Sequence, residues 1–167
     1  MNCQEALLAE YDRESAKTRK IFEAIPDDAD FTYKPHEKSM PLGRLMGHVS
    51  DMTGDWALLT LTKDKLEFPA DHKWEQYEPA SKAALLEKFD RELPEVRKQL
   101  EATTPEQWDQ HWQFIYGGQK FVDEPRHQVF RDMVMNHMVH HRAQLGVYIR
   151  LLGGKLPGCY GPSADEM

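Results

Sequence analysis

Four stretches of this chain place apolar side chains three and four residues apart, which is the spacing of one face of an α-helix. The stretches run over roughly residues 4–25, 39–61, 86–100 and 123–152. The chain has 167 residues, close to the size of one domain. Four amphipathic helices in one domain predict an all-α fold, a four-helix bundle that forms a single domain over residues 1–167.

Proline and glycine indicate where these helices begin and end. Pro41 stands in the first turn of the second helix, after Ser39 as the N-cap. Pro94 lies inside the third pattern and is expected to kink or break that helix. Gly153–Gly154 stop the last helix. The connection over 62–79 is longer than most and permits a crossover, so the order of the helices in space stays open.

Two short β-prone runs, 112–116 and 119–122, flank the pair Gly117–Gly118. Two such runs about a Gly-Gly turn are typical of a β-hairpin. We therefore expect a small hairpin, or an irregular loop, that precedes the last helix and lies over one end of the bundle.

The charge balance and the termini exclude several classes of partner. The formal net charge is −7, and no basic patch is evident, so the chain repels nucleic acid and anionic membrane surfaces. No leader-like segment opens the chain, and no apolar run approaches the roughly 20 residues of a membrane span. Cys3 and Cys159 form no CxxC spacing. These features predict a soluble cytoplasmic protein.

Two of the eight histidines stand one helical turn apart on the last helix. At 3.6 residues per turn, His137 and His141 lie about 40° apart, in the middle of the apolar stripe. Two imidazoles at this spacing can bind one cation from the same side. If both imidazoles were buried without a partner, their ring nitrogens would lack hydrogen bonds, which would cost considerable free energy. The pair therefore predicts a divalent metal site, and the alternative is a pair of hydrogen-bonded core histidines.

A catalytic zinc ion usually takes three protein ligands. His48, inside the second helix and near the border of its apolar stripe, is the best third ligand. Glu14 lies on the apolar stripe of the first helix, so its carboxylate could ligate the metal or hold a ligand imidazole, unless it reaches solvent at the edge. Asp55, two turns beyond His48, and Gln144, on the face of the histidine pair, are pocket candidates or plain helix residues.

Two segments of the chain resemble a known family. They are Asn-His-Met-Val-His-His-Arg-Ala-Gln-Leu over 136–145, which is followed by Tyr-Ile-Arg-Leu-Leu-Gly over 148–153, and Leu-Met-Gly-His-Val over 45–49. Both are similar to the DinB family, within the DinB/YfiT-like superfamily of metalloenzymes. The resemblance implies a four-helix bundle with one metal held by His48, His137 and His141. Ala143 departs from the glycine of many relatives.

The resemblance also suggests what the chain does. Relatives include thiol-dependent enzymes such as mycothiol-dependent maleylpyruvate isomerase and bacillithiol S-transferases. The leading hypothesis is therefore a metal-dependent enzyme that transfers a low-molecular-weight thiol to an electrophilic small molecule. The alternatives are a metal-dependent hydrolase, with Glu14 or Asp55 as the acid or base, and a non-enzymatic metal-binding stress-response protein closed by a fourth ligand such as Glu14.

The donor type bears on the identity of the metal, and the fold bears on the oligomeric state. Three imidazoles suit several divalent metals, of which zinc is the expected ion and nickel an alternative. An amphipathic bundle of this kind often pairs about a two-fold axis, and we expect a homodimer.

Overall fold

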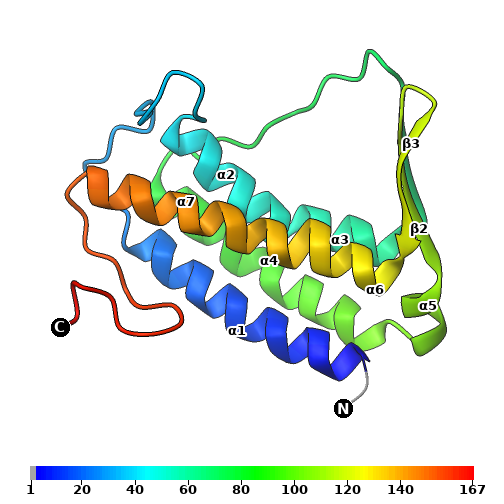
Figure 1. Cartoon of the computed structure of the whole chain (residues 1–167). Helices are drawn as coiled ribbons and strands as arrows, with labels where there is room; N and C mark the ends of the chain where they lie inside the picture. The colour runs from blue at the N-terminus through cyan, green and yellow to red at the C-terminus, as the bar shows by residue number, and fades with distance from the viewer. Residues whose placement is uncertain (1–2) are drawn as a thin grey trace.

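The computed structural model describes residues 3–167 and is mostly helical (Figure 1). Its body consists of four long helices: α1 (Cys3–Glu23), α2 (Leu42–Thr53), α4 (Lys82–Ala102) and α7 (His137–Leu151). Helix α1 packs against α4 and α7, and α2 packs against the same two helices. Each long helix therefore has two neighbours around a shared interior, and the helical part of the predicted fold is present.

The second predicted helix is divided into two. Helix α2 ends at Thr53, and α3 (Asp55–Thr62) begins one residue later. A Cβ on Gly54 would lie only 2.0 Å from Oε2 of Glu92 on α4. Glycine at the junction thus lets α4 approach the backbone closely.

A three-stranded sheet stands at one end of the helices, so the all-α prediction is incomplete (Figure 1). The predicted hairpin is present as β2 (His111–Tyr116) and β3 (Gln119–Pro125), which are antiparallel. Gly117 and Gly118 form its turn with φ of 56° and 78°, values that glycine adopts readily. Strand β1 (Lys65–Phe68) lies in the long connection and pairs with β2 in parallel.

Three short elements complete the chain: α5 (Pro105–Asp109), α6 (Arg126–Val129) and the π-helix η1 (Phe130–Asn136), which continues directly into α7. The last predicted helix therefore begins only after β3 and changes its hydrogen-bonding pattern along its length. Helix α4, in contrast, runs through Pro94 without a break. Its buried residues lie on both sides of the proline, so tertiary packing holds the helix together.

The interior consists of two main apolar clusters. One holds residues of α1, α2, α4 and α7, among them Phe22, Leu45, Met46, Val49, Phe89, Leu145 and Ile149. The other lies nearer the sheet and holds Leu7, Tyr11, Ala57, Val96, Leu100, Trp108, Phe130 and Val134. After α7, the C-terminal segment turns back towards α1 (Figure 1). Among the helices of residues 3–167, none has the length and apolar character needed to cross a membrane.

Candidate metal centre

Three histidines from two helices face one another. His48 lies on α2, and His137 and His141 lie on the first two turns of α7. Their candidate ligand nitrogens all lie within 4.8 Å of one another, and the Nε2 atoms of His48 and His137 are 3.3 Å apart. The ring centroids are separated by 4.5 to 5.0 Å. The structure thus brings together the three residues that the sequence pattern singled out.

Burial keeps these imidazoles uncharged. It lowers the pKa of His48 to about 3, with further lowering by His141, His137 and Arg44. Burial is also the main reason why the pKa values of His137 and His141 are lowered. Neutral imidazoles keep a lone pair on one ring nitrogen, which is the form that binds a metal ion. Donor type, spacing and protonation state therefore fit a divalent metal.

A hydrogen bond to Gln144 orients the ring of His141. Nδ1 of His141 is 2.8 Å from Oε1 of Gln144, an acceptor, so Nδ1 carries the proton and Nε2 keeps its lone pair. The amide nitrogen of Gln144 is in turn 3.0 Å from Nε2 of His140. Gln144, a predicted pocket residue, thus supports a ligand ring instead of reaching the centre itself.

The π-helix η1 ends immediately before His137. In an α-helix the carbonyl of Met133 would accept the backbone N–H of His137, whereas here this N–H donates to the carbonyl of Val134. The backbone of Met133 instead hydrogen-bonds the His137 side chain, which raises the pKa of this ring against the larger, lowering effect of burial. The irregular turn therefore supplies a polar partner to a candidate ligand.

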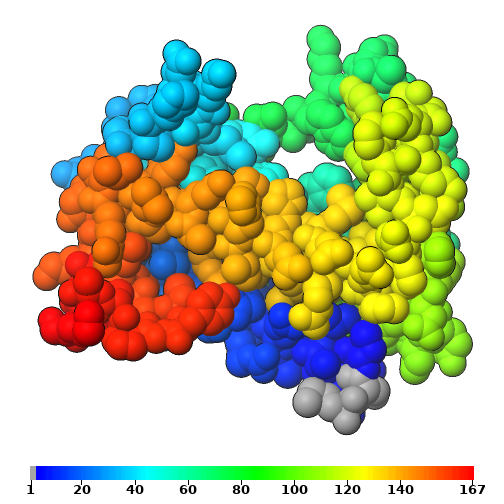
Figure 2. Space-filling model, viewed as in Figure 1, coloured from blue at the N-terminus to red at the C-terminus, as the bar shows by residue number. Residues whose placement is uncertain are grey.

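A cavity of about 290 Å³ opens beside the triad, and His48 and His137 form part of its wall. It lies between α2, α3, η1, the sheet and the connection that carries Trp74, where Figure 2 shows the molecule hollowed between the green connection and the orange helix α7. Gly47 lets this connection approach, since a Cβ there would lie 1.8 Å from the Tyr77 carbonyl oxygen. The triad thus borders a space of the size of a small-molecule site.

Glu14, the predicted fourth ligand or support, lies elsewhere. Its carboxylate is 2.5 Å from Nη2 of the buried Arg142 and also accepts hydrogen bonds from Tyr160, at 2.6 Å, and Lys17, at 2.7 Å. Burial alone would raise the pKa of Glu14, but these three partners lower it to about 2. Glu14 is not a member of the metal-ligand group found among residues 3–167.

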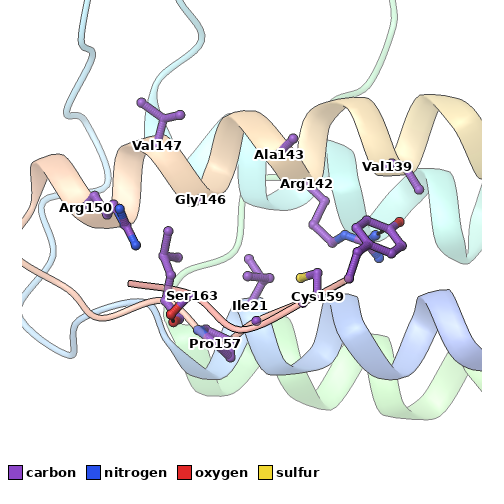
Figure 3. Close-up of a pocket in the computed structure, with 14 residues that line it drawn as sticks. Ile21, Val139, Arg142, Ala143, Gly146, Val147, Arg150, Pro157, Cys159 and Ser163 are labelled. Atoms are coloured by element: carbon purple, nitrogen blue, oxygen red, sulfur yellow. Dashed lines mark hydrogen bonds between the residues drawn. The ribbon is translucent and has the colours of Figure 1, made fainter. Parts of the chain in front are cut away.

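Arg142 and Tyr160, which hold Glu14, line a second cavity of about 470 Å³ beneath the C-terminal segment. Figure 3 shows Arg142, Val139 and Gly146 on α7 above it, Ile21 on α1, and Cys159 on the returning segment. This cavity lies on the side of α7 that faces α1 and the C-terminal segment. Neither His48 nor His137 or His141 lines it.

Asp55 also lies apart from the triad. Its side chain is 55% exposed and pairs with Nζ of Lys88 at 3.0 Å. The carboxylates that line the cavity are those of Asp51, one turn after His48 on α2, and of Glu75 on the connection. Burial raises the pKa of Asp51, while Lys88, at 3.2 Å, lowers it. The sequence analysis missed Asp51 and Arg44, although their spacings of three and four residues from His48 place them on its face.

Comparisons with known proteins agree with the fold. A crystal structure of a DinB-like protein from Bacillus cereus ATCC 10987 superimposes with a TM-score of 0.69 at 18% sequence identity, covering 93% of this chain and 97% of that chain. At this identity the likeness shows the fold alone. No curated protein matches the chain. The model of the DinB family, however, matches residues 1–167, so the chain belongs to the DinB family.

Proposed function

We propose that this protein is a metal-dependent enzyme that transfers a low-molecular-weight thiol to an electrophilic small molecule. The observation that carries the proposal is the cluster of three uncharged imidazoles, two of which, His48 and His137, form part of the wall of a cavity of about 290 Å³. Three histidines leave a position for an exogenous ligand, as in catalytic zinc sites. Zinc is the proposed ion, and nickel suits the same donors.

His48, His137 and His141 would hold the metal, and Gln144 keeps His141 in the required tautomer. When bound there, a divalent metal supplies a Lewis acid that lowers the pKa of a thiol, so that thiolate is present at neutral pH. The cavity walls exclude water and position the electrophile. Asp51 is the carboxylate at hand to take up the thiol proton. A carbon–sulfur bond forms as the leaving group departs with its bonding electrons or, at a conjugated double bond, as the π electrons move towards the conjugated group and a proton is added to the neighbouring carbon.

Metal content is the first test. Protein purified without a nickel column is analysed for metals as wild type, as His137→Ala and as His36→Ala, since His36 is an exposed histidine outside the triad. We expect about one metal per chain in the wild type and in His36→Ala, and a large loss in His137→Ala. Equal metal content in the three proteins would contradict the assignment of the triad.

Thiol transfer is tested with the protein that retains its metal. Common low-molecular-weight thiols are incubated with haloaromatic and α,β-unsaturated electrophiles, and the thioether product is measured. We expect conjugation that is lost after chelation and restored by zinc. Conjugation at the same rate in the chelated and the zinc-loaded protein would refute metal-dependent transfer.

A metal-dependent hydrolase is the second candidate, and Asp51 is the observation in its favour. A partly buried carboxylate with a raised pKa in the cavity beside the triad is suited to general base catalysis. Ester and amide hydrolysis is therefore measured for Asp51→Asn and for the matched variant Asp55→Asn. We expect a loss of roughly 10²-fold or more only in Asp51→Asn, and equal rates in the two variants would exclude this role.

Location and partners belong to the same proposal. Both cysteines, Cys3 and Cys159, are free thiols, which suits the reducing cytoplasm. The net charge of −7 favours a small molecule over nucleic acid as the partner. A non-enzymatic, stress-response role for the metal site is the outcome if metal binds but neither thiol transfer nor hydrolysis is detected.

A further inference from the structure

An arginine beside the histidine triad has a free hydrogen-bond donor. Arg44 stands one turn before His48 on α2 and lines the same cavity. Its Nε donates to the side chain of Gln76. Its Nη1, however, is buried and has no hydrogen-bond partner among residues 3–167. A buried donor of a charged group without a partner is costly, so this nitrogen is suited to an acceptor from a ligand.

Arg44 places a positive charge at this point. It stands one turn before His48 on the same face of α2, so this charge lies close to the triad. Two carboxylates also line the cavity: Asp51, which shares Lys88 with Asp55 and Glu92, and Glu75, which lies exposed on the connection. A metal in the triad would add positive charge next to Arg44. An anionic group between the two would be attracted by both.

Another part of the cavity wall consists of aromatic side chains. Trp56 and Trp74 lie with ring centroids 6.4 Å apart and planes inclined by 32°. Phe114 of β2 lies 6.2 Å from each of them. Trp74 is 42% exposed although it is a large apolar side chain. Rings that line a cavity in this way suit a flat apolar group, which can lie against them.

We propose that the cavity binds a planar, apolar carboxylic acid, with its carboxylate on Arg44 and its ring system against Trp56, Trp74 and Phe114. This inference rests on the proposed function and names the class of its electrophile: an aromatic or conjugated acid. The acid binds through residues of the cavity wall, so its binding does not require the thiol. Arg44 is thus a specificity-determining residue.

Binding of two probes that share a naphthalene ring, one anionic and one neutral, tests this inference. The probes are 2-naphthoate and the neutral 2-naphthylmethanol, and their binding is followed by calorimetry and by quenching of tryptophan fluorescence. Both metal-free and zinc-loaded protein are used, without thiol. We expect the wild type to prefer the acid in both forms. Arg44→Gln lowers the affinity for the acid roughly 10- to 100-fold, the range for a hydrogen bond to a charged group, and leaves that for the alcohol within about twofold.

Two further variants control for folding and for general charge. Arg44→Lys keeps the charge and is expected to retain part of the preference for the acid. Arg91→Gln removes an exposed arginine of α4 that does not line the cavity, and it is expected to bind both probes as the wild type does. Equal affinity of the wild type for the two probes, or an unchanged affinity of Arg44→Gln for the acid, would overturn the inference.

Failure of the proposed function is distinguishable from failure of this inference. Preference for the acid in metal-free protein, together with the absence of any thiol conjugation, supports the binding site and rejects the transferase. Conjugation of neutral electrophiles without preference for acids supports the transferase and rejects the role of Arg44.

Discussion

Replacement of Glu14 by glutamine should destabilise the protein by several kcal/mol and alter how its stability depends on pH. Glu14 is held by Arg142, Tyr160 and Lys17, and its pKa is about 2 instead of 4.5. At about 1.36 kcal/mol for each pKa unit, this difference corresponds to ~3 kcal/mol of stability. The substitution also leaves the charge of Arg142 buried without its carboxylate, which costs roughly 3–5 kcal/mol in comparable pairs.

The sign of the pH dependence follows from the lowered pKa. The folded state holds Glu14 ionised more tightly than the unfolded chain does, so its contribution is fully present above about pH 4.5 and is lost as the pH falls towards 2. The free energy of unfolding is measured by urea denaturation for wild type and Glu14→Gln between pH 7 and the lowest pH at which both fold. We expect the difference between the two to be ~3 kcal/mol at pH 7 and to shrink below about pH 4.5.

A surface variant on the same helix provides the matched control. Glu23 pairs with Arg19 and is 49% exposed, so Glu23→Gln should cost less than about 1 kcal/mol. A loss in Glu14→Gln no larger than in Glu23→Gln, or a difference from wild type that does not change with pH, would refute the reasoning.

Three other results are expected. Gln144→Leu removes the acceptor on His141 and should weaken zinc binding roughly 10- to 100-fold, as measured by competition with a chromogenic chelator; an unchanged affinity would exclude a positioning role. Gly47→Ala would force the Tyr77 carbonyl away and should destabilise the fold by about 1–3 kcal/mol, as measured by thermal unfolding. Gly161→Ala is the control, since a Cβ there meets no atom within 4 Å, and it should cost far less stability. Light scattering of the eluting protein should give the mass of a homodimer, and a monomer at all concentrations would dismiss that prediction.

Helical periodicity was sufficient to locate the triad because it relates residues within one helix. His137 and His141 share a face through their spacing, and His48 lies inside a neighbouring pattern. Periodicity does not determine how each helix is rotated against its neighbours. The periodicity places Glu14 on the apolar stripe and leaves a solvent-facing edge position open, whereas the structure buries it with Arg142 and a tyrosine of the C-terminal segment as partners.

Features that depend on distant pairing carried no local signal. Strand β1 lies in a charged segment with little β-character, and it exists because its backbone pairs with β2, about fifty residues away in the register Leu66↔Phe114. The break between α2 and α3 at Gly54 is a second such feature, since the closeness of Glu92 to that glycine is visible only in the folded chain.

The π-helical turn before His137 has a consequence for how this protein tolerates insertions and deletions. A stretch of this kind accommodates one more residue than an α-helix of the same rise. Removal of one residue from 130–136 would restore α-helical bonding with the flanking residues close to their present orientation, whereas removal of one residue from a regular α-helix rotates its two sides by about 100° against each other. Phe130, now fully buried, and His137 would therefore both keep their directions. The π-helical turn thus gives the chain one position at which its length can change without shifting the hydrophobic core against the candidate metal centre.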